Sequence, residues 1–247
     1  MSSCSFFEKT GYHSSFIIST LKSLTDQEYD EKSEFIYTAF WDATLQPEVL
    51  KLLSEITEGN LPIVLISNLY KVQSKPRLFE ITCGVLVNIS SSGHFFTKTT
   101  EPELTSFIEL LENLLKIEIG VPEAYTQLVK FIHVVLGRFS SGINQFVFID
   151  QLLFLVQNSQ DTDLIKEVVD LLYTVTVYDK NNKITDLPEE AFLAAVNEFK
   201  SEDLLEFDTF LILFPGSERI LGFYKKAFEV SGQFSEISEV LKTKLTL

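Results

Sequence analysis

The stretch PRLFEITCGVLVNIS, residues 76–90, fits two kinds of secondary structure. Counted in steps of two, its apolar residues form an unbroken face from Phe79 to Ile89, which is typical of a half-buried strand. Counted at 3.6 residues per turn, an apolar stripe runs from Leu78 through Ile81 to Ile89, which is typical of an amphipathic helix. The choice between the two decides the fold class of the chain.

Prolines favour the helix. Proline is common in the first turn of a helix, where its missing N–H is not needed, and most prolines of this chain stand at the start of segments with helical period. They are Pro47, Pro62, Pro76, Pro102, Pro122 and Pro188. Thr100 with Glu103 and Asp186 with Glu189 have the spacing of a capping box, which also marks a helix start. The sequence therefore predicts an all-α protein.

The predicted helices come in pairs, with flanking helices at 14–23, 218–230 and 235–243. The pairs are 32–44 with 47–57, 62–72 with 76–91, 103–119 with 122–140, 146–158 with 161–178, and 189–199 with 202–214. In the second pair, Ser74 is placed to cap the helix that begins at Pro76, and Gly84 lets a neighbouring helix approach closely.

An internal echo supports a repeated unit. LVNISSSG at 86–93 recurs as LGRFSSG at 136–142, with weaker matches LYTV at 172–175 and LILF at 211–214. The intervals are roughly 50, 36 and 39 residues, near the span of armadillo and HEAT units. The pattern predicts an armadillo/HEAT-like right-handed solenoid of about five helix pairs over residues 32–247. Residues 1–31 are predicted to form an N-terminal helix and an acidic linker.

The composition limits the classes of partner. With 45% hydrophobic residues and 22 Phe, the chain can bury a sizeable core. The net charge of -15 disfavours binding to nucleic acid or to anionic membranes, because both depend on Lys and Arg, and it favours a protein or peptide partner. Two cysteines, Cys4 and Cys83, argue against a disulfide framework. The absence of a signal-peptide pattern and of a membrane-length apolar run predicts a soluble nuclear or cytoplasmic protein.

Residues 76–90 are similar to the third helices of armadillo repeats, and they resemble more narrowly the serum amyloid A-like, synoviocyte proliferation-associated family. That family carries a Pro-Arg-Leu-x-Glu-Ile-x-x-Gly-Ile-Leu-x-Asn segment. The matching residues are Pro76, Arg77, Leu78, Glu80, Ile81, Gly84, Val85, Leu86 and Asn88. FWD at 40–42 and DTDLIKEVVDLLYTVTVYDK at 161–180 also agree, so that the resemblance covers about residues 12–180. It implies an armadillo-like nuclear or cytosolic protein linked to cell proliferation, with no catalytic residue to carry over.

No cluster of residues predicts a chemistry. His13, His94 and His133 lack the spacing of a zinc site, and there is no nucleophile elbow. Residues 179–190 resemble a calcium loop, but Ile184 stands where glycine is required. The sequence therefore predicts neither catalytic residues nor a cofactor nor a metal.

Second helices of the pairs are expected to line an inner groove. Asn88 has two interpretations there: it holds a ligand backbone, as asparagines of peptide-binding armadillo proteins do, or it bonds to a neighbouring helix. The aligned positions in later units are Arg138, Thr174 and Leu213, so a repeated asparagine ladder is missing. The predicted protein-binding strip consists of Arg77, Asn88, Gln127, Lys130, Arg138, Lys166, Asp170 and Thr174.

The predicted function is a non-enzymatic protein-binding scaffold or adaptor with an armadillo-like groove. One alternative is a regulator of a chaperone or of a nuclear transport factor. An alternative of another class is a hydrolase, which the sequence does not favour.

Overall fold

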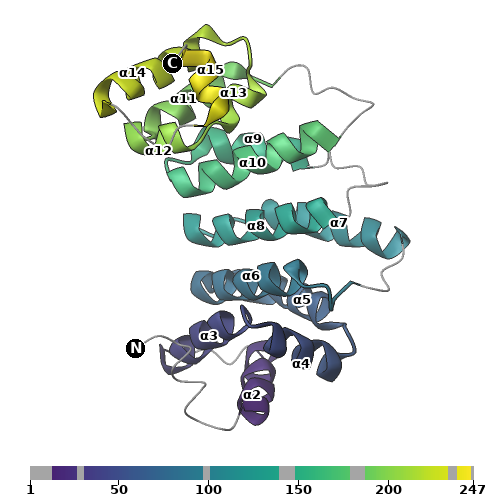
Figure 1. The fold of residues 1–247 in the computed structure, drawn as a ribbon. Helices are drawn as coiled ribbons and strands as arrows, with labels where there is room; N and C mark the ends of the chain where they lie inside the picture. Colours follow the sequence, from purple (N-terminus) through teal and green to yellow (C-terminus); the bar gives the residue numbers. More distant parts are fainter. Residues whose placement is uncertain are drawn as a thin grey trace. The chain divides into compact units, whose positions relative to one another are not determined.

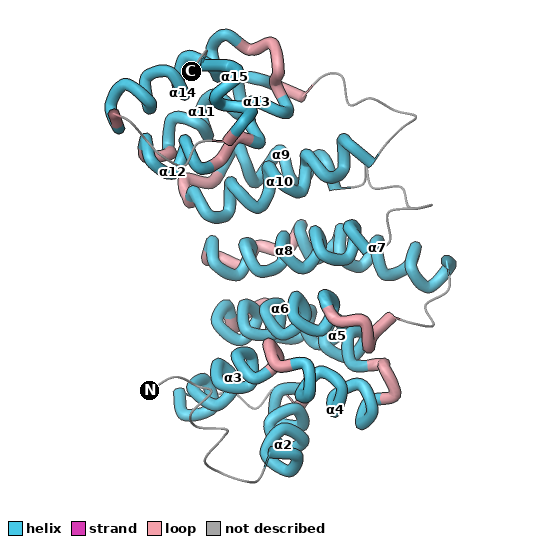
Figure 2. Tube along the Cα trace, in the orientation of Figure 1, coloured by secondary structure: helices cyan, strands magenta, loops and turns pink. Residues whose placement is uncertain are grey.

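The computed structural model describes residues 13–26, 31–96, 101–138, 148–178, 187–232 and 238–245. Within these ranges the chain forms fourteen helices and no strand (Figures 1 and 2). The predicted all-α class is confirmed. The segment that fitted both a strand and a helix is helix α6 (Pro76–Ser91).

The chain divides into two compact units, residues 1–143 and 144–247. The helices of the first unit are α2 (His13–Thr25), α3 (Glu31–Ala43), α4 (Pro47–Thr57), α5 (Leu61–Val72), α6 (Pro76–Ser91), α7 (Glu101–Leu115) and α8 (Pro122–Arg138). Those of the second are α9 (Ile149–Asn158), α10 (Thr162–Tyr178), α11 (Glu189–Glu198), α12 (Ser201–Glu206), α13 (Thr209–Leu213), α14 (Glu218–Ser231) and α15 (Glu239–Leu245). The predicted domain boundary between residues 31 and 32 stays a prediction, and α2 packs against α3 and α5 of its unit.

Helix α6 is the centre of the first unit. It packs against α3, α5 and α8, so that helices cover most of its circumference (Figure 1). Phe79, which fits only the strand pattern, and Leu78, which fits only the helix pattern, are both fully buried. In a helix that is buried on nearly all sides, apolar residues occupy most positions and therefore also fall at the spacing of two that is typical of a strand. This burial explains why the sequence of α6 fits both patterns.

Three helices of the first unit run in the same direction. Near the start of α6, Arg77 bonds Glu34 near the start of α3, and near its end Asn88 bonds Thr44, which follows the end of α3. The last residue of α8, Arg138, bonds the carbonyl of Ser90 at the end of α6. In Figure 1, α3, α6 and α8 accordingly lie at successive levels of this unit.

The second unit has a core of short helices and phenylalanines. Helix α9 packs against both α10 and α11, and α12 packs against α14. The ring of Phe199 is stacked on that of Phe207, at 5.8 Å between centroids, and meets Phe210 edge-on at 5.4 Å. Tyr224 of α14 is fully buried and donates its hydroxyl hydrogen to the carbonyl of Phe207.

The prediction of one helix over 202–214 is wrong. The backbone of Phe207 is extended, with φ -117° and ψ 94°, so α12 ends at Glu206 and α13 begins at Thr209. The carbonyl of Phe207 accepts a hydrogen bond from Tyr224 in place of an intrahelical N–H. The break between α12 and α13 thus coincides with a hydrogen bond from a residue 17 positions later in the chain.

Some predicted helix ends also change. Ser74 does not cap α6: the N-cap residue is Lys75, which makes no side-chain cap, and Pro76 follows it in the first turn. Helix α7 ends at Leu115 instead of Ile119, because the hydroxyl of Tyr125 donates to the carbonyl of Ile117 and accepts from the N–H of Ile119. The proposed caps Thr100 and Asp186 lie outside the described residues.

Candidate functional site

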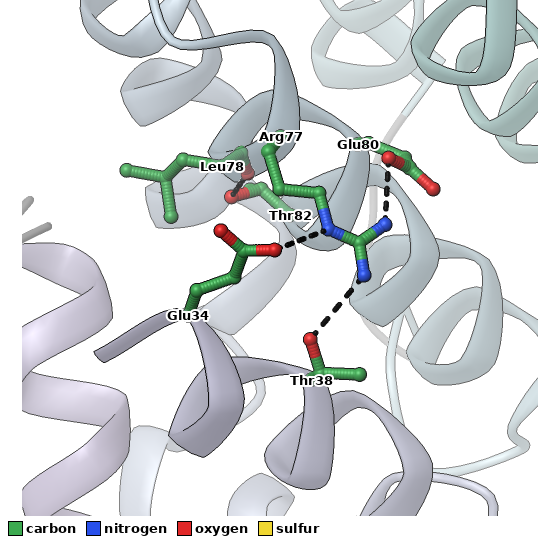
Figure 3. A network of polar contacts seen from close by, with 6 residues as sticks. All are labelled: Glu34, Thr38, Arg77, Leu78, Glu80 and Thr82. Atoms are coloured by element: carbon green, nitrogen blue, oxygen red, sulfur yellow. Dashed lines mark hydrogen bonds and ion pairs between the residues drawn. The ribbon is translucent and has the colours of Figure 1, made fainter. Parts of the chain in front are cut away.

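The polar edge of α6 lies against α3. At its start, Arg77 Nε is 3.3 Å from Glu34 Oε1, and a terminal nitrogen is 2.8 Å from Glu80 Oε2 (Figure 3). A second terminal nitrogen is 3.4 Å from Thr38 Oγ1. The hydrogen bond to Glu80 raises the pKa of Arg77 most, and the charges of Glu80 and then Glu34 raise it further. The predicted strip residue Arg77 is therefore bound within the unit on three sides.

In the middle of the same edge, α6 lies in close contact with α3 at Gly84. A Cβ atom built on Gly84 would lie 2.0 Å from Cε2 of the Trp41 indole, which is far inside van der Waals contact. The indole of α3 thus rests directly on the backbone of α6. The expected close approach at Gly84 is present, and its partner is a side chain from the Phe-Trp-Asp segment.

Asn88 ends this edge and bonds to the neighbouring helix. Its side-chain nitrogen donates to Thr44 Oγ1 at 2.8 Å and to the backbone carbonyl of Trp41 at 3.3 Å. The nitrogen must face α3, because a backbone carbonyl can only accept. The interpretation of Asn88 as a link between helices is therefore correct. Its carbonyl oxygen Oδ1 has no hydrogen-bond partner within the described ranges.

Asn88 also lines an open cavity of about 460 Å³ in the first unit. The cavity lies where α3 ends, α4 begins and α6 ends. Its lining residues are Thr44, Leu45, Pro47, Leu50, Asn88, Ser91, Ser92, Gly93 and His94. Its volume falls within the range of about 300 to 1,000 Å³ that is usual for ligand sites. Asn88 is the one residue of the predicted strip among those that line the cavity.

The segment after α6 forms one wall of this cavity, and Arg138 holds it. The Arg138 guanidinium donates to the carbonyl of Ser90 at 2.9 Å, to that of Phe95 at 2.8 Å and to that of Ser92. It also lies over the ring of Phe96, 5.9 Å from the centroid. A helix end leaves its last carbonyls without intrahelical donors, and Arg138 supplies donors to this one. Arg138 therefore holds in place the segment after α6 that forms one wall of the cavity.

The remaining strip residues of the first unit lie on α8. Gln127 and Lys130 are both half-buried, so neither side chain extends freely into solvent. They stand three residues apart, which places them on neighbouring positions of the helix surface. Their role in binding stays a prediction.

In the second unit, two of the three strip residues of α10 contact residues that follow α10 in the sequence. Asp170 Oδ1 accepts from the hydroxyl of Thr209 at 2.7 Å, and Thr174 donates to the carbonyl of Asp170 at 3.0 Å. The ammonium of Lys166 lies 5.7 Å from the centroid of the Phe199 ring. These side chains share one face of α10, as their spacing predicted. That they continue a strip with residues of the first unit stays a prediction.

The groups considered for chemistry are dispersed. Among the described residues, no three His, Cys, Asp or Glu side chains lie close enough to hold a metal ion. His94 is exposed at the cavity and His133 is half-buried on α8. Cys83 is fully buried, and burial raises the pKa of its thiol. The calcium-like residues 179–186, the side chain of His13 and Cys4 lie outside what the structure describes.

The sequence did not single out most of the cavity. Leu45, Ser92 and His94 lie in turns, where no periodicity marks a face. The repeated Ser-Ser-Gly after two helices was the available signal, because it marks the place where a helix ends and a wall can form. No helix in the described ranges has both the length and the apolar character that crossing a bilayer requires.

Comparison of the chain with protein-family models, with curated proteins and with solved structures found no match. The resemblance to the serum amyloid A-like family therefore stays a prediction.

Proposed function

We propose that this protein is a non-enzymatic scaffold that binds a partner protein and is built as an armadillo-like right-handed solenoid. The observation that carries the proposal is the near-constant sequence separation of the hydrogen bonds between levels of the first unit. The bonds of Arg77 and Asn88 to α3 span 39 to 47 residues, and those of Arg138 span 43 to 48.

Two further hydrogen bonds, from α4 and α5, have a similar sequence separation. Ser54 of α4 bonds the carbonyl of His94 across 40 residues, and Tyr70 of α5 bonds the carbonyl of Leu110 in α7 across 40 residues. In stacked helical repeats each repeat contacts only its neighbours, so parallel helices are joined by bonds between residues that lie about one repeat length apart in the sequence. Armadillo and HEAT repeats have periods of about 40 to 47 residues.

The binding role is supported by the open cavity, because stacked repeats in general act through the surfaces that successive levels expose. The acidic character of the chain, with a net charge of -15, favours a partner that offers basic groups. The resemblance to the serum amyloid A-like family supports a nuclear or cytoplasmic location and a link to proliferation.

Photo-crosslinking from several faces tests the scaffold. A photoreactive amino acid replaces, one at a time, an exposed residue of each region: Ile63 on α5, His94 at the cavity, Phe154 on α9 and Lys225 on α14. In cells, we expect one protein to be captured from at least one position and then to bind the purified chain in stoichiometric amounts by calorimetry. Capture of no protein from any position, or of proteins that fail to bind when purified, would refute the scaffold.

A further inference from the structure

We propose that the exposed side of α14 is a self-association surface, on which a second copy of this chain packs its own α14 in the opposite direction, with a twofold axis at Gly222. The inference goes beyond the proposed scaffold and uses no residue of the cavity in the first unit.

Helix α14 has one buried side and one exposed side. It lies at the edge of the second unit, where it packs against α11, α12 and α13 (Figure 1). Ile220, Tyr224 and Ala227 form its buried side. The exposed residues of the opposite side all lie within about 60° of Gly222, since successive residues of a helix are about 100° apart. This outer face of α14 consists of Glu218, Arg219, Gly222, Lys225, Lys226 and Glu229.

No contact within the described part of the chain explains Gly222. Glycine is a poor helix former, and inside a helix it usually marks a place where another group approaches closely. The Trp41 indole explains Gly84 in this way. A Cβ atom built on Gly222 would meet no atom within 4 Å, and no unusual backbone angle requires glycine there. A helix from outside could rest on Gly222, because small side chains at a contact let two helix axes come closer.

The start of the outer face is acidic. Glu218 is exposed, and the Arg219 guanidinium is bound by Glu190 of α11, whose side chain is 77% exposed. The carboxylate of Glu189 adds its charge beside Arg219. Of the two lysines of α15, one pairs with a carboxylate of its own helix, and Lys244 bonds a backbone carbonyl just before α14. Among the described residues at this end, carboxylates therefore exceed free cations.

The second half of the outer face is basic. Lys225 and Lys226 are exposed and form no ion pair within the described ranges. Glu229, one turn later, is the carboxylate on this half of the face. The acidic residues at the end of α12 lie on the buried side of α14, where Tyr224 bonds the carbonyl of Phe207. The second half of the face therefore carries an excess of positive charge.

A twofold axis at Gly222 brings the two halves together. In an antiparallel pair of helices, a residue that stands before Gly222 faces the residue at a similar distance after Gly222 in the other copy. Glu218, four positions before, then faces Lys225, three positions after. Glu190, held beside position 219, faces Lys226 of the second copy. Each contact forms twice, because a twofold interface uses the same patch on both copies. The pattern of charges is thus self-complementary.

An apolar contact at the ends of the face adds to these charges. Val230 is 70% exposed and, eight positions after Gly222, falls near the exposed Pro215 of the second copy. Covering Val230 removes apolar surface from water, which favours association. The net charge of -15 opposes it, but at 0.15 M salt charges more than about 8 Å apart are largely screened. One helix pair makes a small interface, so we expect a dissociation constant of about 100 μM.

Sedimentation equilibrium of the full chain, at concentrations from about 5 to 500 μM in 0.15 M salt, measures the dimer. Gly222→Leu should weaken the dimer at least tenfold, because its side chain fills the space of the second helix. Gly137→Leu is the matched control: Gly137 is also an exposed glycine of a helix with no atom within 4 Å of an added Cβ, and its substitution should leave the dimer unchanged. Circular dichroism at a few micromolar, where the chain is monomeric, confirms that both variants fold.

Charge reversal locates the contact. Glu218→Lys and Lys225→Glu should each weaken the dimer of that variant at least tenfold, because each places like charges opposite each other twice. An equimolar mixture of the two variants should form a heterodimer within about threefold of the original affinity, since both contacts are then complementary. The two positions lie about 10 Å apart along one helix, so they do not compensate within one copy. Both variants keep a large negative net charge, so general attraction does not explain a heterodimer.

Three results would overturn the proposal: a chain that stays monomeric at about 500 μM, a dimer that Gly222→Leu leaves unchanged, or a mixture of the charge-reversed variants that does not associate. Photo-crosslinking from Lys225 gives an independent check in cells. Capture of a second copy of the chain supports the twofold contact, whereas capture of a different protein in its place would show that the committed occupant is wrong.

Discussion

The central helices of the two units use their polar side chains differently. Arg77 and Asn88 of α6 bond to residues that precede them, in the parallel helix α3 and in the turn that follows it. Asp170 of α10 bonds to Thr209, which follows it by 39 residues, at the first residue of a five-residue helix. The first unit therefore repeats one geometry, whereas the second fills its core with short helices around phenylalanines. Substitutions in each unit test this difference, and the only tryptophan, Trp41, reports on the first unit alone.

The largest effect is expected at Gly84. Gly84→Leu should destabilise the first unit by about 3 kcal/mol, because its side chain would occupy the place of the Trp41 indole. Urea unfolding measures the change, followed by circular dichroism for this substitution and its control and also by tryptophan fluorescence for Gly84→Leu. Gly222→Leu is the matched control: it has open space and should be neutral or stabilise α14 by up to about 1 kcal/mol. Equal effects of the two substitutions would show that Trp41 does not pack on Gly84.

Loss of one polar link in each unit should have an intermediate effect. Asn88→Ala removes the bonds to Thr44 and Trp41, and Thr209→Val removes the bond to Asp170. Each should cost about 1 to 2 kcal/mol, because a partly buried group is left without a partner. The urea midpoint measured by tryptophan fluorescence should shift for Asn88→Ala only. Circular dichroism should detect the loss of stability in both variants. A shift for Thr209→Val as well would mean that the units unfold together.

The second unit should lose stability in alkali. Burial raises the pKa of Tyr224 above its ordinary value of 10.0. Above pH 10 the unfolded chain releases this proton while the folded chain keeps it, so stability falls as pH rises, by about 1 kcal/mol between pH 10 and 11. Urea midpoints from circular dichroism measure the slope. Tyr224→Phe should flatten it, and an unchanged slope in that variant would assign the effect to other groups.

The smallest effect is expected at Arg77. Its side chain is 38% exposed and that of Glu34 is 40% exposed, so solvent screens the ion pair. Arg77→Met should cost less than about 1 kcal/mol, and the cost should shrink further in 0.5 M salt. A loss of stability as large as that of Gly84→Leu would show that the contact at Arg77 contributes as much to the packing of α6 on α3 as the contact at Gly84.

Helix boundaries could be predicted from the sequence where a residue at the boundary determines the backbone conformation. Pro47 and Pro76 set the backbone and remove an N–H, and both predicted helix starts are confirmed. The break at Phe207 could not be predicted, because Leu204, Phe210 and Leu211 continue the apolar pattern on both sides. The hydrogen bond from Tyr224 to the carbonyl of Phe207 belongs to the folded unit, and the local sequence does not contain it.

The site was predictable only in part, for a related reason. The repeated sequence places Asn88 and Arg138 at equivalent helix ends, and both lie near the cavity. Which face of α6 is covered depends on how Trp41 meets Gly84, a contact between residues 43 positions apart. The spacing of apolar residues within α6 does not indicate which face α3 covers. The cavity follows from the same contact, because the position of α3 places Thr44 beside Asn88.

The bonds between neighbouring levels also set an order of events during synthesis. When the ribosome has released residues up to Ser91, every partner of Arg77 and Asn88 is already present, so α3 and α6 can associate at once. The carbonyls of Ser90, Ser92 and Phe95 must then wait in water until Arg138 emerges. At about 5 to 20 residues per second that delay lasts a few seconds, during which α8 does not yet cover its face of α6.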